Sequence, residues 1–154
     1  MSKRPIRCAV RALIVHEDRL LLVNAWKDAR YDLMCAPGGG AEPGSSLPQN
    51  LAREVYEETG LRVRVGAPAL VNEFHDPRSG YHQMEVFFHC TLMGSAQVPE
   101  GWVDPESIVS RHHWVTKDEL ASVNHKPDSL GAVAFADHNT AVPITYDPLE
   151  AIVS

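Results

Sequence analysis

The sequence has few cysteines and no long apolar run. Its three cysteines, Cys8, Cys35 and Cys90, are odd in number, lie far apart and form no C-x-x-C pair. This pattern favours reduced thiols in a cytoplasm over a disulfide framework or a zinc site. No stretch reaches the roughly 18 apolar residues that a membrane span needs, and no apolar run near the N-terminus precedes a cleavage site. We therefore expect a cytoplasmic protein with no membrane partner.

The chain also lacks an excess of positive charge. Its 14 Lys and Arg residues stand against 20 Asp and Glu, which gives a formal net charge of −6. Sequence-independent binding to nucleic acid or to an anionic membrane needs a basic surface, so we expect neither partner. A small anionic substrate is not excluded, because a bound cation reverses the local field.

Several common enzyme motifs are missing. The sequence contains no G-x-x-x-x-G-K-[ST] phosphate loop and no G-x-S-x-G nucleophile turn. Its GGGAEPG segment does not fit G-x-G-x-x-G, because Pro43 stands where the last glycine is needed. The eight histidines include no H-E-x-x-H and no zinc-finger spacing. P-loop, Rossmann and α/β-hydrolase folds therefore have no support.

What the chain does contain is a series of short apolar patterns. With 154 residues and 44% hydrophobic content, it is expected to form one domain over 1–154. The patterns predict strands at 8–15, 20–26, 61–65, 69–75, 82–92 and 108–115, and loops at 27–45 and 94–107. They predict helices at 46–59, 116–120 and 127–138. Strands interleaved with a few helices indicate a mixed α/β or α+β sandwich.

The helix at 46–59 has well-marked ends. Ser46 and Gln49 fit a capping box, and Pro48 lies in the first turn, where a missing N–H has no cost. Gly60 is the residue expected just after the C-terminus. A loop rich in glycine precedes this helix, so backbone and helix are expected to come close together there.

The second half of this helix carries three glutamates, Glu54, Glu57 and Glu58. At about 100° per residue they form one patch along the edge of the apolar face. Like charges four residues apart destabilise a helix by about 0.2–0.5 kcal/mol, so the patch needs compensation. Arg53 can pair with one carboxylate, and a divalent cation could neutralise all three. A solvated acidic face is the alternative, but the glycines ahead of the helix favour the cation.

The run from Gly39 to Leu61 resembles the box of the Nudix (MutT-like) hydrolase family. The family pattern is G-x5-E-x7-R-E-U-x-E-E-x-G-U, where U is a bulky aliphatic residue. The sequence matches it at every defining position except Ser45, where the pattern has glutamate. The stretch HHWVTKDEL near 112–120 is similar to the strand and helix start that often close this fold. The resemblance implies a Nudix-type α/β/α sandwich with a mixed β-sheet.

The resemblance also implies an activity. Nudix enzymes use bound Mg²⁺ or Mn²⁺ to hydrolyse a nucleoside diphosphate linked to another moiety, as in a nucleoside triphosphate, ADP-ribose or a sugar nucleotide. On this pattern the carboxylates of Glu54, Glu57 and Glu58 and the carbonyl of Gly39 would hold the metal. Arg53 would orient a carboxylate by a charge-assisted hydrogen bond. Such an all-oxygen site suits Mg²⁺ or Mn²⁺ and disfavours zinc.

The group that accepts the proton of the attacking water is left open. It is either Glu54 or an acidic residue from a later loop, for which Glu106 is the first candidate and Glu100 the second. For both loop residues the alternative is a solvated surface charge. Glu85 lies opposite the apolar face of its strand and could point into a cleft. The residues assigned to catalysis are Arg53, Glu54, Glu57 and Glu106.

Residues before the glycine-rich loop are candidates for substrate contacts. Lys27 and Arg30 could meet phosphate oxygens, and Trp26 and Tyr31 could stack on a base. Solvated charges and packing residues are the alternative interpretations.

Ser45 leaves a second function open. In the family, the glutamate at this position usually supports the loop and the helix start, so its loss should loosen the site more than abolish it. The alternative is a catalytically weakened module that binds a nucleotide or metabolite. Replacing Glu57 is predicted to remove turnover and leave the fold intact. The substrate stays open, as does a homodimer, which is common in such families.

Overall fold

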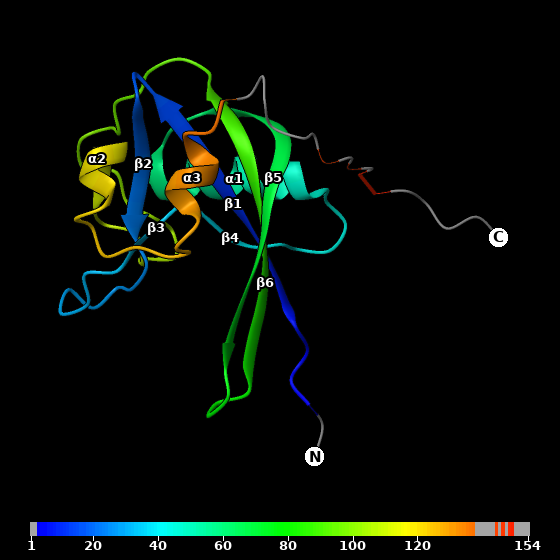
Figure 1. The fold of residues 1–154 in the computed structure, drawn as a ribbon. Coiled ribbons are helices and arrows are strands. Elements are labelled where there is room, and N and C mark those ends of the chain that lie inside the picture. The colour runs from blue at the N-terminus through cyan, green and yellow to red at the C-terminus, as the bar shows by residue number, and fades with distance from the viewer. Residues whose placement is uncertain (1–2, 138–143, 145, 147, 150–154) are drawn as a thin grey trace.

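The computed structural model describes residues 3–137 together with 144, 146, 148 and 149. Within these residues, strands dominate over helices and form one mixed sheet (Figure 1). The strands are β1 (Arg7–His16), β2 (Arg19–Asn24), β3 (Met34–Cys35), β4 (Gly38–Gly40), β5 (Val63–Asp76), β6 (Tyr81–Leu92) and β7 (His112–Thr116). The helices are α1 (Leu47–Thr59), α2 (Lys117–Leu120) and α3 (Leu130–Ala134).

Strand β1 lies at the centre of the sheet. The order is β3-β2-β1-β6-β5, with β4 paired to β1 and β7 paired to β2. β1 runs parallel to β6 and antiparallel to β2 and β4. The sheet is therefore mixed, as predicted. β5 and β6 form a long antiparallel hairpin whose tip extends beyond the rest of the fold (Figure 1).

The two faces of β1 pack into two separate cores. Val10, Ala12 and Ile14 are buried against Leu51 and Val55 of α1. The alternate residue Leu13 belongs to the second core, which includes Phe87 and, from α3, Leu130. Such burial on both faces explains why β1 reads as a nearly continuous apolar run. In Figure 1, α1 lies behind the sheet and α3 in front of it, so the sandwich arrangement is confirmed.

The ends of α1 are confirmed. Ser46 caps the N-terminus through a capping box, because its hydroxyl accepts the Gln49 N–H and the Gln49 side chain accepts the Ser46 N–H. Gly60 ends the helix in the left-handed region with φ 71°. A second capping box, from Thr116 to Glu119, begins α2. None of the described helices has the length and apolar character to cross a membrane.

The prediction of a loop at 27–45 was wrong in part, because β3 and β4 lie within it. β4 consists of glycines, which have low strand propensity, so its sequence gives no strand signal. Its pairing with Ala9–Arg11 of β1 creates the strand. A Cβ on Gly38 would lie 1.9 Å from the Val10 carbonyl oxygen, so only glycine permits this approach.

Other boundaries also differ from the prediction. The two strands expected at 61–65 and 69–75 form the single β5, with irregular pairing on both sides of Pro68. β2 ends at Asn24 and not at 26, and β7 begins at His112 and not at 108. The helix predicted at 127–138 is shorter, from Leu130 to Ala134, and residue 138 is outside the described residues.

Candidate functional site

The three glutamates of α1, here called the carboxylate patch, lie where the helix crosses β4. Glu54 and Glu58 are buried, with 4% and 8% of their surface exposed, and Glu57 is more open. A Cβ placed on Gly39 would be 2.6–2.9 Å from the Glu54 carboxylate atoms. Because glycine has no side chain, the backbone of β4 comes directly against the patch. The structure therefore brings Gly39 together with the predicted carboxylates.

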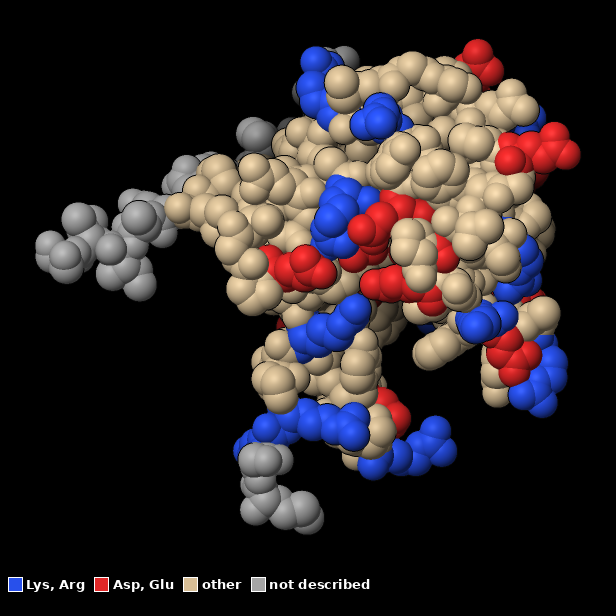
Figure 2. All heavy atoms as spheres, turned by 180° about the vertical axis from the view of Figure 1, so that it is seen from behind, with Lys and Arg blue, Asp and Glu red and all other residues tan. Residues whose placement is uncertain are grey.

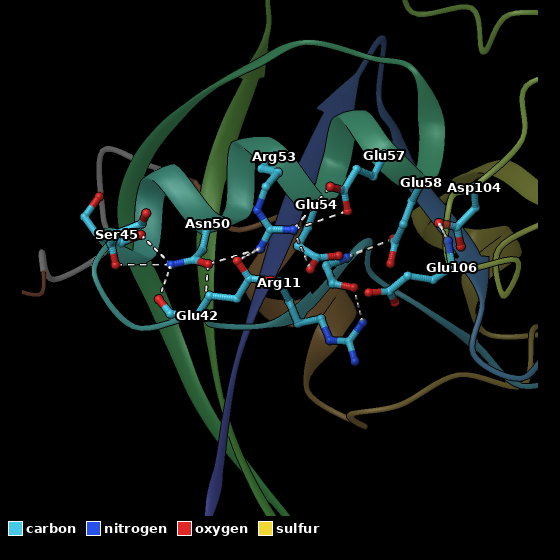
Figure 3. A network of polar contacts seen from close by, with 12 residues as sticks. Arg11, Glu42, Ser45, Asn50, Arg53, Glu54, Glu57, Glu58, Asp104 and Glu106 are labelled. Atoms are coloured by element: carbon cyan, nitrogen blue, oxygen red, sulfur yellow. Dashed lines mark hydrogen bonds and ion pairs between the residues drawn. The ribbon is translucent and has the colours of Figure 1, made fainter.

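Arg53 holds two members of the carboxylate patch together (Figure 3). Its Nη1 lies 3.2 Å from Glu54 Oε1 and 3.2 Å from Glu57 Oε2. Charge-assisted bonds of this kind fix both the positions and the directions of the carboxylates. The pairing predicted from the sequence for one carboxylate thus involves two.

Burial gives two carboxyl groups of the patch unusual pKa values. Desolvation raises the pKa of Glu58 to about 8, against the opposing influence of Arg11 and of the Gly38 N–H that Glu58 accepts. Desolvation also raises the pKa of Glu54, with Arg53 opposing the shift and Glu106 and Glu57 adding to it. Crowded buried carboxylates favour the protonated form unless a cation compensates them.

The donor chemistry of the patch fits a hard divalent cation. Its oxygens come from carboxylates and from the adjacent β4 backbone, and such oxygens are the ligands of Mg²⁺ and Mn²⁺. The described residues contain no group of three His, Cys, Asp or Glu side chains already grouped as for a metal ion. Instead, Arg53 spans Glu54 and Glu57, and the Gly38 N–H binds Glu58 at 3.1 Å. Metal binding would replace these contacts.

The loop after β6 brings a fourth carboxylate, that of Glu106, to the patch. Asp104 is buried, and its carboxylate accepts the N–H groups of Glu106, Ile108 and Val109 at 2.9–3.1 Å. This folded loop places Glu106 beside the patch, where it raises the pKa of Glu54. Glu100 is exposed and does not line the site. Of the two loop candidates, the structure therefore brings only Glu106 to the carboxylates.

A pocket of about 690 Å³ opens beside the patch. Its lining includes Glu58, Gly39 and Glu106 beside the patch, together with the aromatic residues Trp26 and Phe74. The basic residues that line it are Arg7, Arg11, Lys27 and Lys126. Of the residues predicted to contact substrate, Lys27 and Trp26 line the pocket, whereas Arg30 and Tyr31 do not. Arg30 instead pairs with Asp28 at the surface.

Two residues that line the pocket, Arg11 and Glu85, form an ion pair. Arg11 Nε donates to Glu85 Oε2 at 2.8 Å, and Arg11 Nη1 donates to the carbonyls of Ala36 and Gly38 at 3.3 Å. Glu85 Oε1 and Asn72 Nδ2 have no hydrogen-bond partner among the described residues. These two residues are directly opposite each other on β6 and β5. The prediction that Glu85 points into a cleft is confirmed, because it lines the pocket.

Several contacts of the site could not be seen in the sequence. The Trp102 indole N–H donates to the Glu57 carbonyl at 2.8 Å, and His112 Nε2 is 2.9 Å from the Glu58 carbonyl. Arg11 could have been recognised in the sequence by one feature, because it is a charged residue within an apolar strand. Asp104 and Trp102 have no such feature, because they bind mainly backbone atoms that any residue carries.

The charged side chains at the surface show a similar arrangement, with acidic residues surrounded by basic ones. Seen from behind, Figure 2 shows acidic side chains gathered near the middle of the face, with Lys and Arg side chains around them. A dication at the acidic centre and anionic substrate groups at the basic margin would be complementary to this pattern.

Comparison with known proteins finds a matching domain family and relatives of similar sequence. The profile of the NUDIX domain matches residues 5–135. Diphosphoinositol polyphosphate phosphohydrolase 3-alpha from Mus musculus is 32% identical over 114 residues, which cover 72% of this chain and 64% of that protein. The match thus spans less than two thirds of the relative's length.

Solved structures show the same fold. A NUDIX hydrolase from Nitrosomonas europaea superposes with a TM-score of 0.74 at 21% identity, covering 93% of this chain and 98% of that one. An ADP-ribose pyrophosphatase from Streptococcus suis 89-1591 gives a TM-score of 0.54 at 26% identity, covering 74% and 76%.

Proposed function

The chain belongs to the NUDIX domain family, and from that premise we propose that it is a metal-dependent hydrolase of a pyrophosphate linkage in a small organic diphosphate. The observation that carries the proposal is the carboxylate patch, which lies against Gly39 beside a pocket whose lining includes four Lys and Arg residues. Glu54, Glu57, Glu58 and the Gly39 carbonyl would hold the metal, which we take to be Mg²⁺ or Mn²⁺.

The same proposal extends to the chain as a whole. We take 1–154 as one NUDIX domain. Cys8, Cys35 and Cys90 are free thiols in the structure, which supports the cytoplasm as its location.

The reaction would be attack of water on phosphorus. A metal held by the patch would neutralise pyrophosphate charge and lower the pKa of the water. The water oxygen forms a bond to phosphorus, the bridging P–O bond breaks, and the leaving phosphate keeps the electron pair. Glu54 or Glu106 would accept the water's proton, since the two carboxylates are close enough for Glu106 to raise the pKa of Glu54. Arg53 would keep Glu54 and Glu57 in place.

The pocket favours a nucleoside diphosphate derivative as the substrate. Trp26 and Phe74 line the pocket and offer apolar surfaces for a planar ring. A nucleobase is a flat ring of this kind. A diphosphoinositol polyphosphate is the second candidate, because it names the activity of the 32% identical relatives and would use the basic residues of the pocket.

The test is product release with Mg²⁺ and with Mn²⁺ over nucleoside triphosphates, ADP-ribose, sugar nucleotides and a diphosphoinositol polyphosphate. Wild type would be compared with Glu57→Gln and with the control Glu73→Gln. The Glu73 carboxylate pairs with His82 on an exposed strand surface. We expect turnover of one substrate class, a loss of at least about 100-fold in Glu57→Gln, and wild-type rates in Glu73→Gln.

A different result would favour the alternative function. Nucleotide binding without metal-dependent turnover of any substrate would contradict the hydrolase and support a binding module. Equal rates in Glu57→Gln and wild type would contradict the proposed role of the patch.

A further inference from the structure

Asn50 uses its whole side chain to join the glycine-rich loop to α1. Its Nδ2 donates to the carbonyls of Glu42, Ser45 and Ser46 at 3.0–3.2 Å. Its Oδ1 accepts the Glu42 N–H at 2.9 Å and Arg53 Nη2 at 3.1 Å. A carboxamide has two donor hydrogens and two acceptor lone pairs, so these contacts use its full capacity. Only 1% of the residue is exposed, so water cannot easily replace them.

These contacts link two parts of the candidate site. Arg53 is held at both ends of its guanidinium, with Nη2 on Asn50 and Nη1 on Glu54 and Glu57 (Figure 3). A planar guanidinium that is fixed at both ends cannot rotate away from the carboxylates. Asn50 therefore connects the loop after Gly40 to the orientation of two members of the carboxylate patch.

Ser45 shows why such a link is needed. Its side chain is exposed, and within the described chain its hydroxyl makes no hydrogen bond, so the residue takes part only through its carbonyl. The position where the family box has glutamate thus gives no side-chain support to loop or helix. Asn50, one turn into α1, binds that same residue's carbonyl and the backbone on both sides of it.

We propose that Asn50 is a positioning residue that takes over the support lost at Ser45, closing the loop on α1 and orienting Arg53 against Glu54 and Glu57. This inference rests on the proposed function, because the carboxylates that it positions are the proposed metal ligands. It predicts that Asn50 acts on metal binding and on kcat, and that glutamate at position 45 can replace it in part.

A purely structural role is the rival explanation, and Gln49 provides a matched control. Gln49 is the neighbouring residue, and its side chain also holds the start of α1, through the Ser46 N–H at 3.0 Å. It contacts neither the loop carbonyls nor Arg53. Asn50→Ala and Gln49→Ala would therefore both disturb the helix start, and only Asn50→Ala would release the loop and Arg53.

The experiment compares wild type, Asn50→Ala, Gln49→Ala and the double variant Ser45→Glu/Asn50→Ala by three measurements. These are Mn²⁺ affinity by calorimetry, hydrogen–deuterium exchange of backbone amides 38–45, and kcat and KM. In Asn50→Ala we expect Mn²⁺ affinity and kcat to fall about 10–100-fold, KM to change little, and loop exchange to accelerate. Gln49→Ala should match wild type in all three, and the double variant should recover part of the loss.

Each result decides the proposal. Mn²⁺ affinity and loop exchange in Asn50→Ala within about twofold of wild type would overturn it, as would losses of equal size in Gln49→Ala. An absence of Mn²⁺ binding in wild type would also overturn it. If wild type binds Mn²⁺ but turns over no substrate, the proposed hydrolase fails, and Asn50 is still judged on affinity and exchange.

Discussion

At the scale of single residues, the space around Gly39 sets how close the backbone comes to Glu54. A methyl group there would meet the end of the Glu54 side chain, which can rotate away. The fold should therefore accept alanine while the carboxylate loses its place.

We expect Gly39→Ala to lower kcat by at least about 10-fold and to change the free energy of unfolding by less than about 1 kcal/mol. Gly40→Ala is the matched comparison, because its methyl would meet the Arg7 guanidinium at the pocket instead. That variant should raise KM more than it lowers kcat. Steady-state kinetics and urea unfolding of both variants check this, and an unchanged kcat in Gly39→Ala would be inconsistent with metal binding beside Gly39.

At this scale, the spacing of residues in the box predicted which side chains lie close together. Arg53 and the carboxylate patch follow from their spacing on a helix, and the structure brings them together. Asp104 and Asn50 could not be predicted, because their partners are mainly backbone groups. No side-chain pattern marks such a contact before the loop is folded.

At the scale of elements, local signals predicted α1 and failed on β4. The boundaries of α1 are set by Ser46 and Gly60, which are part of its own sequence. β4 is a strand only because it pairs with β1, and a run of glycines has no sequence pattern that predicts this pairing. The merging of two predicted strands into β5 has the same origin, since β6 pairs along its whole length.

The end of α1 allows a test at this scale. Gly60 and Gly101 have nearly equal φ angles of 71° and 73°. A methyl on Gly60 would lie 2.9 Å from Pro99 and Trp102, whereas one on Gly101 would meet nothing within 4 Å. Both alanine variants carry the left-handed backbone cost of about 1–2 kcal/mol.

We expect Gly60→Ala to reduce the free energy of unfolding by about 1 kcal/mol or more beyond Gly101→Ala, because of overpacking. Urea unfolding of the two variants measures the difference. Equal losses would mean that Trp102 moves aside without cost.

At the scale of the whole molecule, the buried patch makes stability depend on pH when no metal is bound. The pKa of Glu58 rises from 4.5 to about 8 on folding, chiefly through desolvation. A raised folded-state pKa means that the native protein binds this proton more tightly than the unfolded chain. The resulting contribution to the free energy of unfolding is fully present below about pH 4.5 and is lost as the pH rises to about 8.

We therefore expect the free energy of unfolding of metal-free protein to decline from about pH 5 to about pH 8. Glu58→Gln, which mimics the protonated group, should lack this part of the decline. Urea unfolding in EDTA at a series of pH values would measure both curves. Parallel curves for wild type and Glu58→Gln would contradict the raised pKa.

The contacts that Trp102 and His112 make with the carbonyls of Glu57 and Glu58 have a consequence for protein synthesis. A ribosome delivers α1 well before it delivers β6, β7 or the loop between them. Until then β1 lacks its parallel partner, and the end of the helix lacks the side chains that bind it. A nascent chain that ends before His112 thus holds the carboxylates without their final setting, and the candidate site is completed only after His112 has been added.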